Sequence, residues 1–251
     1  MEVITIANQK GGCGKTTTAV NLSSYLASRG KKVLLIDLDP QASATTHLGV
    51  NEDLENSMYE VLIEDLSLLQ LAMPTAINGL DLAPADKRLG RAEMELANKT
   101  VAREGVLKPK VRSQNAYDFV LIDTPPNLGF LTINAMVAAD TVLVPIQTEF
   151  FAIKGLSMIM DMVKLISTDL NQDMKMRYLL TMYDARTNLS KEVVKRVREL
   201  LGEDVFKVVI PRSVKLAEAP SYGKPINLID PESPAASAYS QLAEEVIMDA
   251  R

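Results

Sequence analysis

The stretch of this chain most suited to chemistry is Lys10-Gly11-Gly12-Cys13-Gly14-Lys15-Thr16-Thr17. Glycines let the backbone turn sharply and approach an anion closely, so that successive N–H groups can point at phosphate oxygens. Lys15 adds a positive charge, and Thr16 supplies a hydroxyl where such loops hold Mg²⁺. Gln9 replaces the first glycine of the strict pattern G-x-x-x-x-G-K-[ST], and a second lysine, Lys10, opens the loop. We predict a nucleoside-phosphate site here rather than a glycine-rich turn without a ligand.

Three aspartates follow or end apolar runs that are typical of buried parallel strands. Asp37 and Asp39 follow the run 33–36, and Asp123 ends the run 119–123. The carboxyl ends of parallel strands meet at the edge of the sheet where ligands bind, so we expect the three carboxylates beside the phosphate loop. A divalent cation would relieve their repulsion of a nucleotide. Taken singly, each aspartate is as readily a turn or cap residue.

Within this set we predict that Mg²⁺ and its waters are held by Thr16, Asp37 and Asp123. We predict that Asp39 orients the attacking water, because phosphoryl transfer depends mainly on positioning and charge stabilisation. A GTP site usually carries an Asn-Lys-x-Asp run, whereas the only Asn-Lys here, at 98–99, is not followed by that aspartate. ATP is therefore the expected nucleotide.

Strands and helices must alternate to position these residues. The apolar patterns predict strands at 3–7, 33–36, 80–83, 119–123, 141–145, 177–183 and 205–210, with Pro211 closing the last, and helices at 16–29, 131–139, 153–168, 190–201 and 235–250. Residues 86–112 are expected to be partly helical, with a break at 108–110. With no linker between these elements, we predict one α/β domain over residues 1–251: a doubly wound, mostly parallel sheet with helices on both faces.

Composition limits the other classes. The chain has 251 residues, of which 47% are hydrophobic and 24% charged, a formal net charge of −5 and a single cysteine. One cysteine excludes an intrachain disulfide framework or all-cysteine metal site, and the acidic balance argues against a generally basic nucleic-acid coat. No apolar run approaches the roughly 18 residues of a membrane span. A strand is expected at the very start, with no signal peptide before it, so we expect a cytoplasmic protein.

The motifs at 10–17, at Asp37-Leu-Asp-Pro-Gln41 and at Asp123-Thr-Pro-Pro126 together resemble those of the deviant Walker A ATPases of the ParA/MinD group. The segments 182–190, 210–215 and 218–225 resemble the chromosomal, Soj-type ParA branch. The resemblance implies a P-loop NTPase fold and slow, partner-stimulated ATP hydrolysis with Mg²⁺. It also implies an ATP-dependent homodimer, in which Lys10 reaches the phosphates bound by the partner copy.

The resemblance implies further site residues. Lys10, Lys15 and Asp39 would be catalytic. Pro211 and Arg212 would pack against adenine, and Glu149 would contact ribose near the dimer seam. The DNA-binding extension that precedes the first strand in some plasmid ParA proteins is expected to be absent.

A local excess of positive charge suggests a DNA-binding face. Residues 186–224 contain nine Lys or Arg against five Asp or Glu, and binding that is independent of sequence depends mainly on phosphate neutralisation. The Soj-type resemblance places DNA contacts at Arg186 and Lys215; auxiliary candidates are Lys191, Lys195, Arg196 and Arg198, for which a solvated helix face is an equal alternative. It implies a ParB-type partner and segregation of chromosome or plasmid DNA on the nucleoid. We expect nonspecific binding to double-stranded DNA with ATP and little with ADP.

Other functions stay open as alternatives. A MinD-like membrane ATPase needs a basic amphipathic C-terminal helix, whereas residues 241–251 are acidic, so no membrane is expected. An ATPase that positions a non-DNA cargo on the nucleoid would share the same motifs. An iron–sulfur electron carrier lacks its cysteines, and a small-molecule ligase lacks a recognisable substrate pocket.

Three lesser expectations concern single residues. His47 is expected at the surface or in a cap, and Met158, Met160 and Met162 in the core. Cys13 is expected to expose its thiol when nucleotide is absent.

Overall fold

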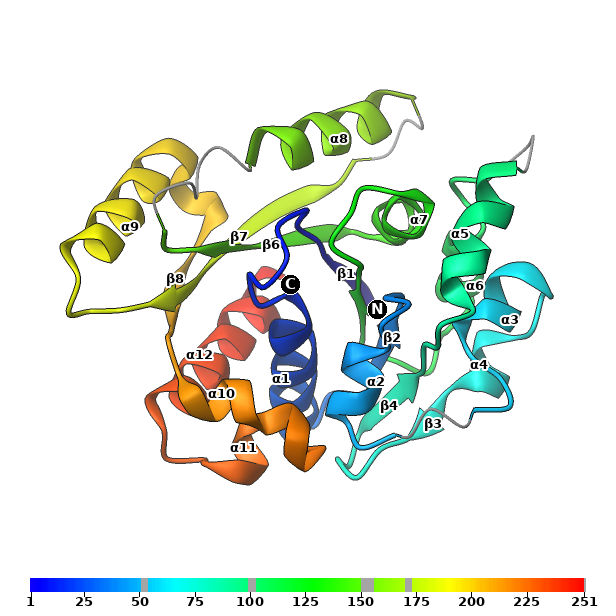
Figure 1. Ribbon diagram of the computed structural model, residues 1–251, viewed down its shortest axis with the longest axis horizontal. Helices are drawn as coiled ribbons and strands as arrows, with labels where there is room; N and C mark the ends of the chain where they lie inside the picture. The colour runs from blue at the N-terminus through cyan, green and yellow to red at the C-terminus, as the bar shows by residue number, and fades with distance from the viewer. Residues whose placement is uncertain (51–53, 99–102, 150–155, 170–172, 251) are drawn as a thin grey trace.

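The computed structural model describes residues 1–50, 54–98, 103–149, 156–169 and 173–250. Within these ranges the backbone forms one eight-stranded sheet in the order β3-β4-β2-β5-β1-β6-β7-β8 (Figure 1). The strands are β1 (Glu2–Ile6), β2 (Val33–Asp37), β3 (Met73–Pro74), β4 (Leu80–Ala83), β5 (Phe119–Asp123), β6 (Thr141–Gln147), β7 (Lys175–Tyr183) and β8 (Val205–Pro211). Only β3, at one edge, pairs antiparallel with its neighbour among these strands. The predicted doubly wound α/β fold is confirmed.

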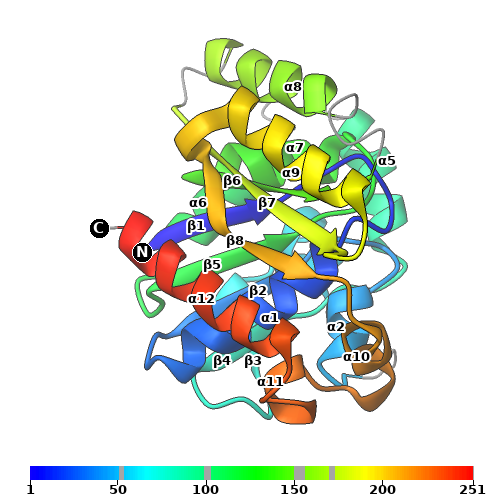
Figure 2. The same cartoon turned by 90° about the vertical axis from the view of Figure 1, so that its left-hand side faces the viewer.

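Helices cover both faces of the sheet (Figures 1 and 2). One face carries α1 (Lys15–Ser28), α2 (Ser43–His47), α10 (Val214–Glu218), α11 (Ile226–Ile229) and α12 (Pro234–Asp249). The other carries α3 (Met58–Ile63), α4 (Leu68–Leu71), α5 (Leu89–Asn98), α6 (Leu107–Arg112), α7 (Phe130–Ala138), α8 (Leu156–Asp169) and α9 (Asn188–Leu201). Short 3₁₀ turns, η1 (Gly202–Asp204) and η2 (Ala219–Tyr222), follow α9 and α10.

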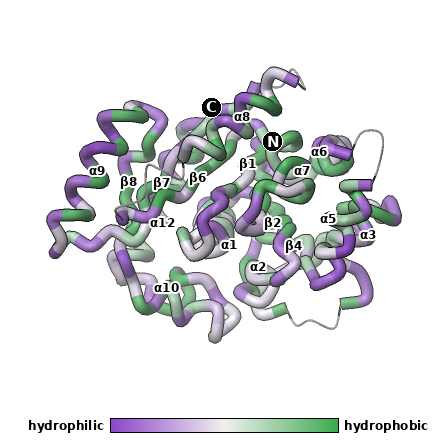
Figure 3. Tube along the Cα trace, turned by 45° about the horizontal axis from the view of Figure 1, so that its top comes forward, coloured by the Kyte–Doolittle hydropathy of each residue, from purple (hydrophilic) through white to green (hydrophobic). Residues whose placement is uncertain are grey.

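Successive side chains of each central strand enter opposite cores, which explains their continuous apolar runs. In β2, Val33 and Leu35 pack under α1 and α12, whereas Leu34 and Ile36 pack under α3 and α5. Figure 3 shows apolar residues along β1, β2, β6 and β7 and hydrophilic residues along much of α9. No helix in the described ranges combines the length and the apolarity that crossing a membrane requires.

The register of the central strands brings the predicted carboxylates together. Asp123 ends β5 directly opposite Ile6 of β1 on one side and Asp37 of β2 on the other. The phosphate loop leaves β1 at the same edge. Parallel pairing alone therefore places two aspartates beside residues 10–17.

Several local predictions were wrong. The short elements α10, α11 and β3 were not predicted. Pro109 does not break a helix, because it lies in the first turn of α6, where an N–H would have no intrahelical acceptor. The predicted strand 141–145 is too short, because β6 continues past Pro145 to Gln147, whereas β8 ends at Pro211 as predicted. The predicted start of a helix at 153–155 lies outside the described residues.

Candidate active site

The predicted phosphate loop joins β1 to α1 in the conformation that its glycines allow. Gly12 and Gly14 have φ values of 70° and 93°, a region that other residues rarely adopt. Gly14 is also the N-cap of α1. A Cβ built on Gly11 or Gly12 would meet nothing within 4 Å, so the loop is open on its outer side. An anion at this place would face the free N–H groups of a 14-residue helix.

Two polar residues that the sequence did not single out hold the loop. The side chain of Asn8 accepts the N–H of Lys10 at 3.0 Å and donates to the carbonyl of Pro145 at 2.7 Å. The hydroxyl of Thr181, in β7, donates to the carbonyl of Cys13 at 2.9 Å. Both side chains are buried at the ends of apolar strands. A polar residue at the end of an otherwise apolar strand needs a hydrogen-bond partner when that end is buried, and this is the signal that would have identified both residues.

The two lysines of the loop differ in environment. Lys15 is 7% exposed, and its Nζ lies 3.4 Å from the carbonyl of Lys10, inside the curve of the loop. The side chain of Lys10 is 44% exposed and points to the surface, where Nζ meets Glu149 Oε2 at 2.9 Å. Gln147 also donates to Glu149. The structure thus brings Lys10 and Glu149 together, with Lys15 serving the loop itself.

Asp37 is fully buried and its carboxylate is filled by protein donors. Oδ1 accepts the N–H of Asp39 at 3.0 Å, and Oδ2 accepts the N–H and the hydroxyl of Thr45 at 2.9 and 2.8 Å. Burial raises the pKa of Asp37 to about 6, opposed by the Thr45 hydrogen bonds. The same Thr45 hydroxyl accepts the N–H of Ala85 at 3.0 Å, which ties α2 to the end of β4. Thr45 was not predicted.

Asp123 is the aspartate with an unused oxygen. Its Oδ2 accepts the hydroxyl of Thr16 at 2.7 Å, while its buried Oδ1 has no hydrogen-bond partner among the described residues. Burial, and then the charge of Asp37, raise the pKa of Asp123 well above its ordinary value. A buried carboxylate oxygen without a donor is costly unless a cation or an ordered water fills the position.

These residues fit a magnesium ion held largely through water and phosphate. No cluster of three or more His, Cys, Asp or Glu side chains with metal-binding geometry occurs in the described ranges. Mg²⁺ commonly uses only one or two protein ligands beside nucleotide oxygens. Thr16 and Asp123 offer a hydroxyl and a free carboxylate oxygen, while Asp37 is already saturated by protein donors. Asp39 is 8% exposed. Its carboxylate accepts the N–H of Gln41 at 2.9 Å, and its own N–H donates to Asp37.

A cavity of about 250 Å³ adjoins the loop where the adenine contacts were predicted. Pro211 and Arg212 line it, as do Gly14 and Thr17 of the loop region. The other lining residues were not predicted as site residues; they include Thr181, Met182, Leu216 and Tyr239. Met182 has a φ of 54°, unusual for a residue with a side chain. The cavity continues from the phosphate loop, as the base of a nucleotide would require.

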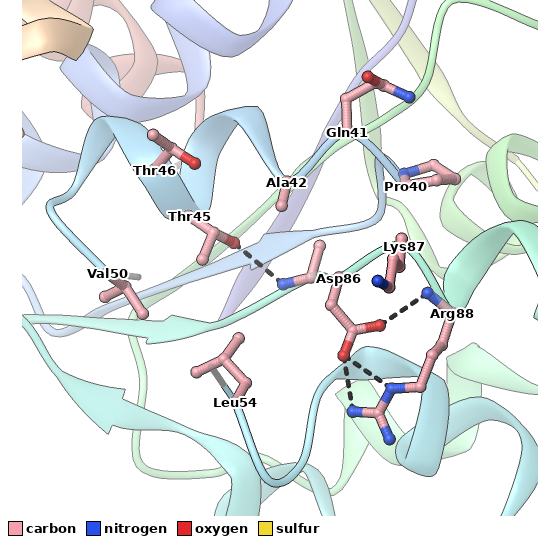
Figure 4. A pocket seen from close by; sticks show the side chains of 11 residues that line it. Pro40, Gln41, Ala42, Thr45, Thr46, Val50, Leu54, Asp86, Lys87 and Arg88 are labelled. Atoms are coloured by element: carbon pink, nitrogen blue, oxygen red, sulfur yellow. Dashed lines mark hydrogen bonds and ion pairs between the residues drawn. The ribbon is translucent and has the colours of Figure 1, made fainter. Parts of the chain in front are cut away.

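A second cavity, of about 450 Å³, lies beside the segment that follows Asp39 (Figure 4). Its wall includes Pro40 and Gln41, which follow Asp39, and Thr46 of α2. Across from them lie Lys87 and Arg88, with Asp86 holding the Arg88 side chain. No motif had indicated this cavity.

The predicted DNA-contacting residues lie on α9, on α10 and in the turn after β7, and most are paired with acids. Arg186 pairs with Asp184, and Lys215 pairs with Glu218. On α9, Lys195 pairs with Glu199 and Arg196 with Glu192, while Arg198 donates to the carbonyl of Lys207; Lys191 is exposed on the same helix. Exposed pairs of this kind contribute little to stability and can exchange partners.

Residues 87–112 contain further Lys and Arg side chains. In the described part of this stretch five of them pair with nearby acids: Arg88 with Asp86 and Glu60, Arg91 with Glu95, Arg103 with Glu104, Lys110 with Asp65, and Arg112 with Asp140. Glu93 of α5 accepts the N–H groups of Phe130 and Leu131 at 2.6 and 3.0 Å, and so caps α7 beyond the Asp123 loop. Gly129 leaves the space, since a Cβ there would lie 1.9 Å from Glu93 Oε1.

Three lesser expectations are corrected. Cys13 is fully buried and burial raises the pKa of its thiol, so it is not an exposed nucleophile. His47 is 1% exposed rather than a surface residue, because α2 packs against η2. Met158 and Met160 are 51% and 40% exposed on α8, and only Met162 packs against a core.

Comparisons with known proteins add a family to this geometry. A family model described as an AAA domain matches residues 1–176. The sporulation initiation inhibitor protein Soj of Bacillus subtilis (strain 168) is 47% identical over 248 residues, which cover 98% of both chains. The chromosome-partitioning ATPase Soj of Thermus thermophilus is 46% identical over 97% of this chain and 94% of its own. A solved structure of cobyrinic acid a,c-diamide synthase from Mycobacterium smegmatis, with bound ATP analog and magnesium, has a TM-score of 0.86 and 34% identity, covering 98% of this chain and 94% of that one.

Proposed function

The chain belongs to the ParA/Soj family of deviant Walker A ATPases, and from this premise we propose that it segregates or positions DNA. As an ATPase it uses ATP and Mg²⁺. In our proposal one domain, residues 1–251, dimerises with ATP and binds double-stranded DNA without sequence preference. A ParB-type partner then stimulates hydrolysis, which ends the DNA-bound state on the nucleoid. Chromosome and plasmid DNA are both suitable cargo.

The observation that carries this proposal is the contrast between the two loop lysines. Lys15 lies inside the phosphate loop, whereas Lys10 points outward and is held only by the exposed carboxylate of Glu149. A loop that needed one lysine for its own nucleotide would have no use for an outward one. Lys10 is free to leave Glu149 for the phosphates of a second copy, since an exposed pair is weak.

In this proposal the chain's own residues divide the work of hydrolysis. Lys15 and the N-terminus of α1 bind the phosphates, and Thr16 and Asp123 hold Mg²⁺, which would neutralise charge on the phosphoryl group. Asp37 positions Thr45 and the backbone of Asp39, so that Asp39 can orient the attacking water. Lys10 from the second copy completes the charge stabilisation. Hydrolysis would thus require the dimer.

DNA binding follows from the same dimer. The cations on α9, α10 and the turn after β7 are few in one copy, and pairing two copies raises the effective concentration of the second set once the first is bound. Sedimentation of the protein with a random-sequence DNA duplex tests this directly. We expect binding with a slowly hydrolysed ATP analogue and little with ADP, and equal binding in both states contradicts the proposal.

The C-terminal helix supports this function over the MinD-like alternative. Tyr239, Leu242 and Val246 of α12 are 3% exposed or less and pack in the core. The apolar side of α12 is therefore already used inside the molecule, and its exposed side is not basic. Co-sedimentation with anionic liposomes separates the two functions, and we expect none with ATP.

A small-molecule synthase is a second candidate because of the 450 Å³ cavity beside Pro40 and Gln41. The name of the Mycobacterium smegmatis protein refers to amide synthesis on a small molecule. Stimulation of ATP hydrolysis by DNA and a partner protein, with none by small carboxylic acids and glutamine, favours the partition function. The reverse pattern favours the synthase.

A further inference from the structure

Arg186 is held more completely than the other exposed cations near it. One oxygen of the Asp184 carboxylate accepts the backbone N–H and the Nε of Arg186 at 3.0 and 2.9 Å, and the other accepts a terminal guanidinium nitrogen at 2.7 Å. The arginine side chain is 87% exposed and that of Asp184 only 20%. The guanidinium therefore lies at the surface with its planar fork already occupied by an anion.

Carboxylate and phosphate compete for the same pair of N–H groups on the Arg186 guanidinium. Both present two oxygens to the parallel N–H groups of a guanidinium, so Arg186 cannot give DNA a bidentate contact while Asp184 holds it. The i,i+4 pairs on α9 differ, because each joins two flexible, exposed side chains. Asp184 is instead fixed at the end of β7, where its backbone also contacts Thr187 and Ser190.

Asp184 also lies next to the 250 Å³ cavity. Thr181 and Met182, three and two residues earlier, line that cavity, and Met182 has the strained φ of 54° beside a register shift in the β7–β8 pairing. The carbonyl of Tyr183 accepts the N–H of Arg212 at 2.9 Å, and Arg212 lines the cavity too. The hydrogen bonds with Arg186 are the main cause that lowers the pKa of the Asp184 carboxyl, and the positive charge of Arg212 lowers it further.

We propose that the Asp184 carboxylate occupies Arg186 in place of DNA phosphate, and that the neighbouring cavity controls its release. A ligand in the cavity changes the position of Met182 and Arg212, moves Asp184 toward Arg212, and leaves Arg186 free for phosphate. The inference rests on the proposed DNA binding and gives it a residue-level control. It needs no change in the fold.

Asp184→Asn tests the proposal because it removes the charge and keeps the shape. We expect the variant to bind a random-sequence DNA duplex about two- to fivefold more tightly per protomer than the wild type, the range of one exposed ion pair. We also expect the DNA affinity with an ATP analogue to exceed that with ADP by a smaller factor than in the wild type. Asp184→Ala should change the DNA affinity and the dependence of that affinity on nucleotide in the same directions, so the test stays valid if one of the two variants folds poorly. Nucleotide titration checks the fold.

Two comparisons isolate the gate from general electrostatics. Glu192→Gln removes one negative charge nearby, as Asp184→Asn does, and releases Arg196. Its effect therefore measures the gain in DNA affinity that the loss of any such charge would give. In an Arg186→Ala background, Asp184→Asn should give no gain in DNA affinity beyond that of Glu192→Gln. Three results would overturn the proposal: a gain for Asp184→Asn no larger than that for Glu192→Gln, a gain in the Arg186→Ala background larger than that for Glu192→Gln, or an unchanged ratio of the DNA affinities with an ATP analogue and with ADP. If the wild type itself does not bind DNA with ATP, the proposed function fails instead.

Discussion

At the scale of single residues, position decides what each charge can do. Lys10 and Lys15 are five residues apart, yet one is exposed and the other buried in the loop. Asp37 and Asp123 are opposite each other in the register, yet one is filled by donors and the other keeps an unused oxygen. The residue types alone predicted that these charges share one site. They did not predict that one lysine is exposed and the other buried, or that one of the two aspartates keeps an oxygen without a partner.

Lys10→Ala should bind nucleotide normally and lose hydrolysis by about 100-fold or more, the cost of removing one preorganised charge stabiliser. In the proposed dimer Lys10 acts on phosphates bound by the other copy, while Lys15 still binds the phosphates of its own nucleotide. Steady-state phosphate release and a nucleotide titration measure the two effects. Lys32→Ala, an exposed lysine before β2, is the matched control. Normal hydrolysis by a monomeric Lys10→Ala protein would refute the role of Lys10.

Asp123→Asn should stabilise the protein without nucleotide, by about 1–2 kcal/mol, and weaken binding of Mg²⁺·ATP. The carboxylate is fully buried beside Asp37, so a neutral side chain removes the cost of burying a charge and the repulsion between the two carboxylates. Urea unfolding at pH 8 measures the stability, and nucleotide titration with and without Mg²⁺ measures the binding. A less stable variant with unchanged Mg²⁺ dependence would contradict this assignment.

At the scale of elements, the sequence predicted the strands and long helices and missed the short connections. Runs such as Val33–Ile36 and Phe119–Ile122 admit one interpretation, because a strand with both faces buried needs apolar residues throughout. The turn from Ser43 to His47 has no such pattern, and only tertiary contacts with Asp37 and η2 make it a helix. Thr181 and Asn8 escaped notice for the same reason: their partners lie more than 130 residues away.

The packing of α2 on η2 predicts a pH dependence through His47. Burial lowers the pKa of His47 to about 4, so the folded protein keeps it neutral where an unfolded chain would protonate it near pH 6.5. Stability is therefore complete above about pH 6.5 and is lost progressively as the pH falls toward 4, by up to about 3 kcal/mol. Unfolding at several pH values should show a steeper acid loss for the wild type than for His47→Asn. Equal slopes would mean that His47 is protonated in the folded state.

At the scale of the whole molecule, net charge and local charge have opposite signs. The chain carries −5 overall, while residues 186–224, which include α9, α10 and the turn after β7, contain nine Lys or Arg against five Asp or Glu. Arg186→Glu should abolish DNA binding with ATP and leave ATP binding intact, because the guanidinium lies outside the nucleotide cavity. A fluorescence titration with DNA at several salt concentrations measures the loss.

Arg91→Glu is the control for that experiment, since the Arg91 side chain is also exposed (74%, against 87% for Arg186) but lies on α5, away from α9 and α10. We expect it to bind DNA nearly as well as the wild type. Comparable losses in the two variants would show that DNA responds to total charge and not to the predicted face.

The position of β1 in the middle of the sheet has a consequence for synthesis. Residues 2–6 pair with 119–123 and 141–143, Asn8 reaches Pro145, Cys13 reaches Thr181, and Thr18 reaches Tyr239. The segments that shape the phosphate loop therefore follow it in the chain by as many as 221 residues, so the loop acquires its shape through contacts of high sequence separation. A chain still being synthesised that ends before β7 and α12 contains the motif but lacks Thr181 and Tyr239, which fix its surroundings.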